Sequence, residues 1–290
     1  MRNLCFLLLI CSLVLTACGS RASAQANAAA QKTIENTGSD TIVNLALAWA
    51  EAYQKVKPEV RISVSGGGSG TGLAALINKT TDIANASRKI NDTETQDAKK
   101  NGVEPHEIEI ARDAIGVIVN PHNPVQQLTL QQIADIYSGK ITNWKDVGGE
   151  DRPIVLLSRE SNSGTHVYFL AQVVRLGNSK DKTLFSQDTL LLPSSEGIMA
   201  EVRQNPNAIG YDGLGYITPD VKTLGIASKA GGEYVKPSVE TVNNGKYPIA
   251  RPLFMYTNGE PTGDVKTYID WILGSGGQKI VGDLGFVPLQ

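Results

Sequence analysis

The chain has 290 residues, with 27 basic and 29 acidic side chains and a formal net charge of −2 at pH 7. This balance provides no basic surface of the kind that binds nucleic acid. The three cysteines all lie within the first 18 residues and the chain has three histidines, so we expect neither a structural metal site nor a cofactor. The length accommodates one large domain or two lobes of ordinary size.

The N-terminal residues are typical of an exported protein. A short basic start precedes an apolar run from Leu4 to Leu15, which is too short to span a bilayer comfortably. The run ends in LTAC, which resembles the lipobox of bacterial lipoproteins, where cleavage leaves an acylated N-terminal cysteine. We expect a signal peptide over 1–17, lipidation of Cys18 by a fatty acid such as palmitate, and a flexible tether over 18–32. The alternative is a conventional signal peptide that contains a cysteine.

From Thr33 onward, short apolar runs alternate with helical patterns. A helix is expected after Gly38, because its apolar residues recur at helical spacing until Pro58 ends it. Those residues are Ile42, Leu45, Ala46, Trp49 and Tyr53. The next elements are predicted to be a strand at 60–65, a short helix after 66–72, a strand at 81–87 and a helix at 92–101.

The segment 106–121 is long for a single strand and predicts a strand, a turn and a second strand. Thr129 is predicted to open an amphipathic helix over 129–139. The remaining predicted elements are a strand at 152–159, a helix at 163–177, a strand with a glycine-rich turn at 205–217, an extended segment at 247–258 and short helices at 263–274 and 276–285.

This alternation predicts an α/β fold with largely parallel sheets. Two such blocks, with long extended segments near 106–121 and 247–258, indicate two lobes that the chain crosses twice. We expect lobe 1 to begin with 33–116, lobe 2 to cover 117–248, and 249–290 to return to lobe 1. A ligand would then bind between the lobes, at the carboxyl ends of strands and the amino ends of helices.

Three predicted strand-to-helix junctions carry glycines and small hydroxyl residues. They are GSDT at 38–41, GGGSGTG at 66–72 and SNSGT at 161–165. The first turn of a helix leaves backbone amides free and is partly positive, so each junction is suited to an oxyanion. Ser, Thr and Asp are also ordinary helix N-caps, so one junction alone would be a weak signal. Three in one chain are a stronger one.

Arg88 and Arg159 each follow a predicted strand, where a guanidinium could hold two oxygens of a tetrahedral anion. The alternative for each is an ordinary salt bridge, and it applies more readily to Arg88. The glycine-rich stretch at 66–72 is not a nucleotide phosphate loop, because no Lys-Ser or Lys-Thr follows it.

Six motifs occur in a fixed order along the chain: GSDT, GGGSGTG, ANASRKI, GKITNWKDVGG, SRESNSGT and AIGYDGLGYI. Together they resemble the phosphate-binding proteins of bacterial phosphate ABC transporters, from Thr33 to Gln290. The resemblance implies the two-lobed type II periplasmic-binding-protein fold with two crossover hinge segments. It also implies a non-enzymatic monomer that captures inorganic phosphate and delivers it to an ABC permease. The protein would lie outside the cytoplasm, in the periplasm or anchored to the bilayer through acylated Cys18.

The resemblance also assigns site residues. From lobe 1 it implies Ser39, Asp40 and Thr41 at the first junction and Ser69, Gly70 and Thr71 at the second. From lobe 2 it implies Arg159, Ser163, Gly164 and Thr165. Arg88 is added as a candidate from its position after the strand.

Two positions depart from one branch of this family. Arg88 stands where that branch has an aspartate that accepts the proton of hydrogen phosphate, and Ser161 stands where it has an aspartate that orients the binding arginine. We expect Glu160 to replace the second of these. For the first, one hypothesis is that Asp40 accepts the proton while Arg88 balances the charge; the other is that Asp40 only caps its helix. Phosphate and another tetrahedral oxyanion, such as sulfate or molybdate, both remain open.

A phosphoester hydrolase is the alternative from a different class of function. His166 lies close to Ser163 in the sequence, but neighbouring positions on a helix point apart, and no partner carboxylate is evident. An anion sensor or an adhesin with the same fold is a further alternative. Trp144 is expected to anchor a loop, Trp49 and Trp271 to be core residues, and Tyr211, Gly213 and Tyr216 to shape lobe 2 near the mouth of the cleft.

Overall fold

The computed structural model describes residues 32–289, which form one compact unit of α/β structure. The predicted signal peptide, Cys18 and nearly all of the tether lie outside the described residues. The strands are β1 (Lys32–Gly38), β2 (Val60–Ser65), β3 (Ile83–Ala86), β4 (Pro105–Val119), β5 (Gln127–Thr129), β6 (Val155–Arg159), β7 (Leu190–Leu192), β8 (Ala208–Gly213), β9 (Lys222–Thr223), β10 (Gly225–Ala227) and β11 (Ala250–Asn258).

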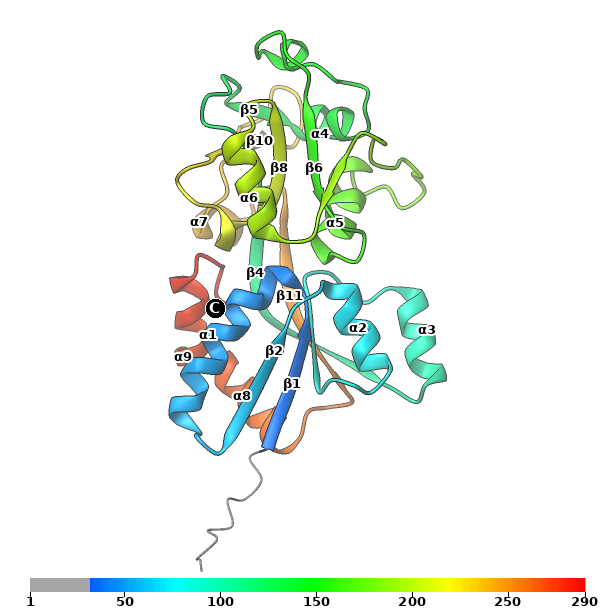
Figure 1. The fold of residues 1–290 in the computed structure, drawn as a ribbon, viewed down its shortest axis with the longest axis vertical. Coiled ribbons are helices and arrows are strands. Elements are labelled where there is room, and N and C mark those ends of the chain that lie inside the picture. Colours follow the sequence, from blue (N-terminus) through cyan, green and yellow to red (C-terminus); the bar gives the residue numbers. More distant parts are fainter. Residues whose placement is uncertain (1–31, 290) are drawn as a thin grey trace, which may run out of the picture. The chain divides into compact units, whose positions relative to one another are not determined.

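The helices flank these strands (Figure 1). They are α1 (Asp40–Val56), α2 (Ser69–Ile77), α3 (Asp92–Lys100), α4 (Leu130–Tyr137), α5 (Gly164–Phe169), α6 (Ser195–Gln204), α7 (Val239–Asn243), α8 (Gly263–Leu273) and α9 (Ser275–Asp283), with short 3-10 turns η1 (Trp144–Val147) and η3 (Leu214–Tyr216). The π-helical turn η2 (Leu170–Val174) continues α5. Within residues 32–289, no helix has the length and apolar character needed to cross a bilayer.

One mixed sheet runs through the described part of the chain in the order β2-β1-β3-β11-β4-β8-β6-β7, with β9 also paired to β4. The pairs of β1 with β2 and β3, and of β6 with β7 and β8, are parallel. The long strands β4 and β11 are antiparallel to each other and connect the two groups of parallel strands. A separate parallel pair joins β5 and β10.

The buried apolar side chains divide into cores on either side of this central pair. In β4, Ile110 and Ala111 belong to the core that contains Trp49, whereas Ile115 and Val117 belong to the core that contains Trp144. We call the half built on β1, β2, β3, α1, α2, α3, α8 and α9 lobe 1, and the half built on β6, β7, β8, α4, α5 and α6 lobe 2. The chain crosses between the lobes in β4 and again at the start of β11, as the alternation predicted.

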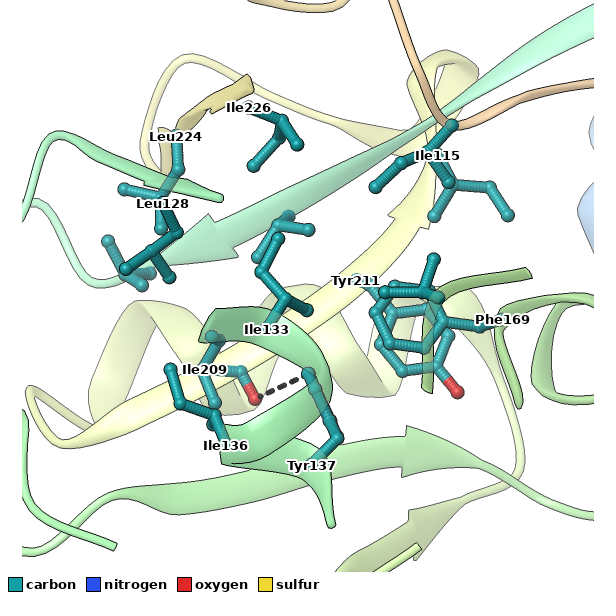
Figure 2. Close-up of a cluster of buried hydrophobic side chains, with 14 of the residues drawn as sticks. Ile115, Leu128, Ile133, Ile136, Tyr137, Phe169, Ile209, Tyr211, Leu224 and Ile226 are labelled. Atoms are coloured by element: carbon teal, nitrogen blue, oxygen red, sulfur yellow. Dashed lines mark hydrogen bonds between the residues drawn. The ribbon is translucent and has the colours of Figure 1, made fainter. Parts of the chain in front are cut away.

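The core of lobe 2 is rich in aromatic and β-branched residues (Figure 2). The rings of Phe169 and Tyr211 stack with their centroids 3.6 Å apart. Tyr137 packs edge-on against both rings, and its hydroxyl donates to the main-chain oxygen of Ile209 at 3.3 Å. This packing fixes α5 against β8. The start of α5, which is the third junction, is therefore held in a defined place.

Most of the predicted elements are present, and α1, β2, α3, α8 and α9 lie where the pattern placed them. Thr129 caps α4 through a reciprocal pair of hydrogen bonds with Gln132. Trp144 is buried and its indole donates to the carbonyl of Asn207, so it anchors a loop as expected. Tyr211 belongs to the core of lobe 2.

The prediction for 106–121 was wrong. β4 is one continuous 15-residue strand. Its first ten residues pair with β11 up to Ala114, and the pairing then passes to β8 from Ile115 onward. The change in sequence pattern therefore reflects a change of partner strand and of lobe. Helix α6 was not predicted at all.

Candidate functional site

The first two junctions meet at a cluster of buried hydroxyls in lobe 1. Ser39 Oγ donates to Ser87 Oγ at 3.0 Å, and Ser87 Oγ lies 3.3 Å from Ser69 Oγ. The amide of Ser87 also donates to Ser69 Oγ at 3.0 Å. All three residues are buried. Ser39 directly precedes α1 and Ser69 begins α2, so the cluster stands at two helix amino ends, each partly positive.

Glycines let these junctions approach one another closely. Gly38 has φ +144°, and a Cβ built there would lie 2.3 Å from the oxygen of Asn85 on β3. Gly68 has φ +94°, a value that disfavours other residues, and its amide donates to the oxygen of Gly38 at 2.9 Å. Glycine is therefore required at both positions by backbone packing as well as by conformation.

The third junction, from lobe 2, lies against this cluster. A Cβ built on Gly164 would be 2.2 Å from Ser69 Oγ and 2.5 Å from Ser87 Oγ. The hydroxyls of Thr41 and Thr165 are 2.8 Å apart across the lobes. The amide of Gly70 donates to the oxygen of Asn162 at 3.0 Å. Three helix amino ends from two lobes therefore converge.

Ser163 is the N-cap of α5, and Thr165 lies in the first turn of that helix. The Ser163 hydroxyl caps this helix by accepting from the backbone amides of Thr165 and His166. Both side chains are buried. The ring of His166 turns to lobe 2, where its Nδ1 lies 3.0 Å from Ser158 Oγ, and burial lowers the pKa of the imidazole.

Arg159 ends β6 and is almost fully buried, with 1% of its surface exposed. Its guanidinium donates to Ser195 Oγ at 2.9 Å, and to the main-chain oxygens of Pro193 at 2.8 Å and Leu192 at 3.3 Å. It also forms an ion pair of 3.0 Å with Asp40, from lobe 1. The segment 192–195 thus orients the arginine toward the interface between the lobes.

Asp40 takes a role that neither sequence hypothesis described. One carboxylate oxygen accepts from the amide of Ser195 at 2.9 Å and pairs with Arg159. Both partners belong to lobe 2, so Asp40 forms a polar contact between the lobes. The main-chain oxygen of Asp40 also accepts from the hydroxyl of Tyr216 at 2.8 Å.

Arg88 does not join the site, and its assignment as an anion ligand is corrected. Its guanidinium forms two hydrogen bonds with the carboxylate of Glu94, at 2.7 and 2.8 Å. The reason is local: β3 ends at Ala86, and of the next two residues Ser87 faces the hydroxyl cluster while Arg88 turns toward the start of α3. Charge compensation of Asp40 by Arg88 is wrong for the same reason.

Two further expectations are corrected. The carboxylates near Arg159 are Asp40 and Asp212, at 3.0 and 3.9 Å, whereas Glu160 is exposed and does not orient the arginine. Thr71 is also exposed, and its hydroxyl donates to the oxygen of Gly67 at 2.6 Å within its own loop.

Sequence reasoning missed Ser87, Ser195, Asp212 and a buried ion pair between Arg251 and Asp113. The two charges of that pair lie in register on β11 and β4, 3.0 Å apart. A signal was present for Arg251, because it is the only charged residue in the otherwise largely apolar strand β11. No sequence pattern indicated that the two strands pair.

The carboxylates of the site have unusual environments. Burial raises the pKa of Asp212 to about 6, although Arg159 and hydrogen bonds from Gly213 and Ser195 oppose the rise. Burial also raises the pKa of Asp113, against the lowering effect of Arg251. One oxygen of Asp212 is buried and has no hydrogen-bond partner among the described residues. Asp212 therefore protonates more readily than an ordinary exposed aspartate.

Comparison with known proteins agrees with this architecture. Residues 23–275 match the PBP superfamily domain. The chain is 33% identical over 273 residues to the phosphate-binding protein PstS of Pseudomonas aeruginosa, covering 88% of this chain and 83% of that protein. It is 32% identical over 269 residues to the phosphate-binding protein PstS of Bacillus subtilis, covering 92% and 84%.

A solved structure with bound phosphate, of a substrate-binding protein assigned to phosphate ABC transport in Clostridium perfringens, superposes with a TM-score of 0.80. Its sequence is 33% identical, and the match covers 89% of this chain and all of that one. A phosphate transport receptor from Vibrio cholerae superposes with a TM-score of 0.71 at 27% identity. The fold is that of type II periplasmic binding proteins, and the chain belongs to the PBP superfamily and, within it, to the family of PstS phosphate-binding proteins.

Proposed function

We propose that this protein captures inorganic phosphate between its two lobes and delivers it to an ABC permease. The observation that carries the proposal is the convergence of three helix amino ends, with their hydroxyls, from both lobes. A tetrahedral anion needs several donors from different directions, and hydroxyls and first-turn amides supply them. The phosphate-bound relative from Clostridium perfringens supports phosphate as that anion.

The ligand set that we propose has two parts. Lobe 1 contributes Ser39, Thr41 and Ser69, with Ser87 added from the structure. Lobe 2 contributes Arg159, Ser163, Gly164 and Thr165 through the guanidinium, hydroxyls and amides. Asp40 joins this set indirectly, because its carboxylate shares Arg159 with the anion. The Gly70 amide already donates to Asn162, so we assign it to holding the two lobes together.

We propose that the two lobes close on each other by a hinge motion. Lobe 1 would consist of 33–116 together with 249–290, and lobe 2 of 117–248. An anion that touches both lobes binds the closed form more tightly than the open one and therefore favours closure. The direct contacts between Thr41 and Thr165, and between Asp40 and Arg159, support a closed form of this geometry.

The cellular setting is also a proposal. We infer a monomer held on the extracytoplasmic face of the membrane through acylated Cys18, which passes phosphate to the permease and binds it without chemical change. The motif LTAC and the relatives' role in phosphate transport support this setting. Mass spectrometry of the membrane fraction would detect the acylated Cys18 peptide.

Isothermal titration of the mature chain, freed of bound anion, tests the binding function. We expect tight, one-to-one binding of phosphate and at least about 100-fold weaker binding of sulfate, equivalent to about 2.7 kcal/mol. Equal binding of both anions would identify a general oxyanion-binding protein, and binding of neither would refute the proposal. The variant Arg88→Gln is a matched control. The guanidinium of Arg88 donates to the carboxylate of Glu94, away from the site, so its removal should not change the phosphate affinity.

A further inference from the structure

A second buried arginine stands behind the hydroxyls of the site. Arg251 is the second residue of β11, where the chain crosses between the lobes, and its side chain is 1% exposed. Its neighbour in register on β4 is Asp113, which is fully buried and accepts from Nε and Nη2 of Arg251 at 3.3 and 3.0 Å. The pair therefore lies at the crossing between the lobes.

The same guanidinium contacts site residues of both lobes. Nη2 lies 2.9 Å from Thr165 Oγ1, in lobe 2, and 3.4 Å from Thr41 Oγ1, in lobe 1. Nη1 donates at 3.0 Å to the main-chain oxygen of Ser87, whose hydroxyl belongs to the cluster in lobe 1. One side chain thus holds three of the residues that we assign to the phosphate.

The chemistry of the groups determines where the hydroxyl hydrogens point. A guanidinium has only donors, so the oxygens of Thr41 and Thr165 must accept from it. The hydrogen bond between the two threonines uses one of their two hydroxyl hydrogens. The other hydrogen cannot point at Arg251 and remains for a different acceptor. An anion placed among the three helix amino ends is such an acceptor.

We propose that Arg251 is a positioning residue for phosphate: by donating to the oxygens of Thr41 and Thr165, it directs toward the anion the one hydroxyl hydrogen that their mutual hydrogen bond leaves free. Asp113 holds the guanidinium in the required orientation. The inference rests on the proposed phosphate site and adds a residue that does not touch the ligand. The competing explanation is that the ion pair of Arg251 with Asp113 only stabilises the pairing of β4 with β11.

A double-mutant cycle separates the two explanations. We expect Arg251→Gln to raise the phosphate Kd about 10- to 100-fold, because hydrogen bonds from a charged group are lost. In a Thr41→Val, Thr165→Val background the same substitution should raise the Kd by less than about threefold, since its effect passes through those hydroxyls. Arg112→Gln removes the neighbouring but exposed arginine of β4 and should leave the Kd unchanged.

Several outcomes would overturn the inference. An Arg251→Gln Kd within threefold of the wild-type value would do so, and so would an equal loss in both backgrounds. If circular dichroism shows that Arg251→Gln is unfolded, the same cycle is run with Arg251→Lys. Lysine keeps the positive charge but lacks the planar guanidinium that donates to several acceptors at once, and the same criteria apply. A wild-type chain that binds no phosphate refutes the proposed function instead.

Discussion

Asp40 and Arg159 form a charged contact that the two lobes share. The carboxylate lies 3.0 Å from the guanidinium and accepts from the Ser195 amide, while Ser195 Oγ links Arg159 to Asp212. Two acidic groups therefore offset the charge of the arginine that we assign to the anion. This limits how strongly the site attracts a fully ionised dianion such as sulfate.

Asp40→Asn should change selectivity. With one negative charge removed beside Arg159, we expect the ratio of sulfate to phosphate affinity to rise about tenfold, equivalent to about 1.4 kcal/mol. Competition titrations at pH 7 measure this ratio. Asp92→Asn is a matched control, because Asp92 is exposed and likewise begins a helix, α3. An unchanged affinity ratio in Asp40→Asn would show that Asp40 does not contribute to the discrimination between phosphate and sulfate.

Asp212 should make stability depend on pH. Burial raises its pKa to about 6, so the folded state binds its proton more tightly than the unfolded state does. A group of this kind destabilises the fold progressively as pH rises from about 4 to about 6, and its cost is then constant. The largest cost is about 3 kcal/mol, from about 1.4 kcal/mol for each pKa unit.

Asp212→Asn should remove this dependence. We expect the free energy of unfolding of the variant, relative to the wild type, to increase between pH 4 and pH 6 and to stay level above pH 6. Urea denaturation at several pH values measures the difference. A difference that is the same at pH 4 and at pH 7 would show that Asp212 is ionised with an ordinary pKa.

At the scale of elements, the site depends on how closely α5 approaches α1, α2 and β3. Gly164 opens α5, and its Cα faces Ser69 and Ser87 of the other lobe without a side chain between them. The stacked rings of Phe169 and Tyr211 hold the rest of the helix in lobe 2. The approach therefore requires glycine at position 164, as it does at Gly68, where a Cβ would lie 2.7 Å from the oxygen of Asn162.

Gly164→Ala should prevent full closure while leaving each lobe folded. Its Cβ would lie 2.2 Å from Ser69 Oγ, a clash that opening of the lobes relieves. We expect the phosphate Kd to rise at least about 100-fold, equivalent to about 2.7 kcal/mol, with little change in circular dichroism. Gly282→Ala, in α9, is the control, because its nearest neighbour would be 3.5 Å away. Wild-type affinity in Gly164→Ala would show that the closed contact is not needed for binding.

The sequence predicted elements better than it predicted contacts between them. Local signals, such as the helical spacing in α1 and the cap at Thr129, were sufficient to place those helices. Arg88 was misassigned because a position at the end of a strand does not reveal to which side the next residue turns. Arg251 and Asp113 were missed because their roles arise from the pairing of β11 with β4, which lie far apart in the chain. Ser87 was missed because its role arises from contacts with Ser39 and Ser69 on other elements.

At the scale of the whole described unit, the polar contacts at the site join one lobe to the other. Thr41 with Thr165, Asp40 with Arg159, and Gly70 with Asn162 each cross the interface. Two antiparallel strands carry the chain between the lobes, so a hinge at β4 and β11 would break these contacts together. We therefore expect binding and closure to be a single coupled event.

A distance measurement between the lobes tests this coupling most directly. Glu51 on α1 and Lys145 in η1 are exposed and lie in lobes 1 and 2. In a Cys18→Ala, Glu51→Cys, Lys145→Cys variant, the engineered cysteines are spin-labelled selectively, because Cys18 is the only cysteine after the predicted signal peptide. Pulsed electron–electron double resonance then measures the distribution of distances between the two spin labels. We expect saturating phosphate to shift the distribution toward a single closed distance and an equal concentration of sulfate to leave it unchanged. A distribution that phosphate does not alter, in protein that binds phosphate by titration, would contradict capture by closure of the two lobes.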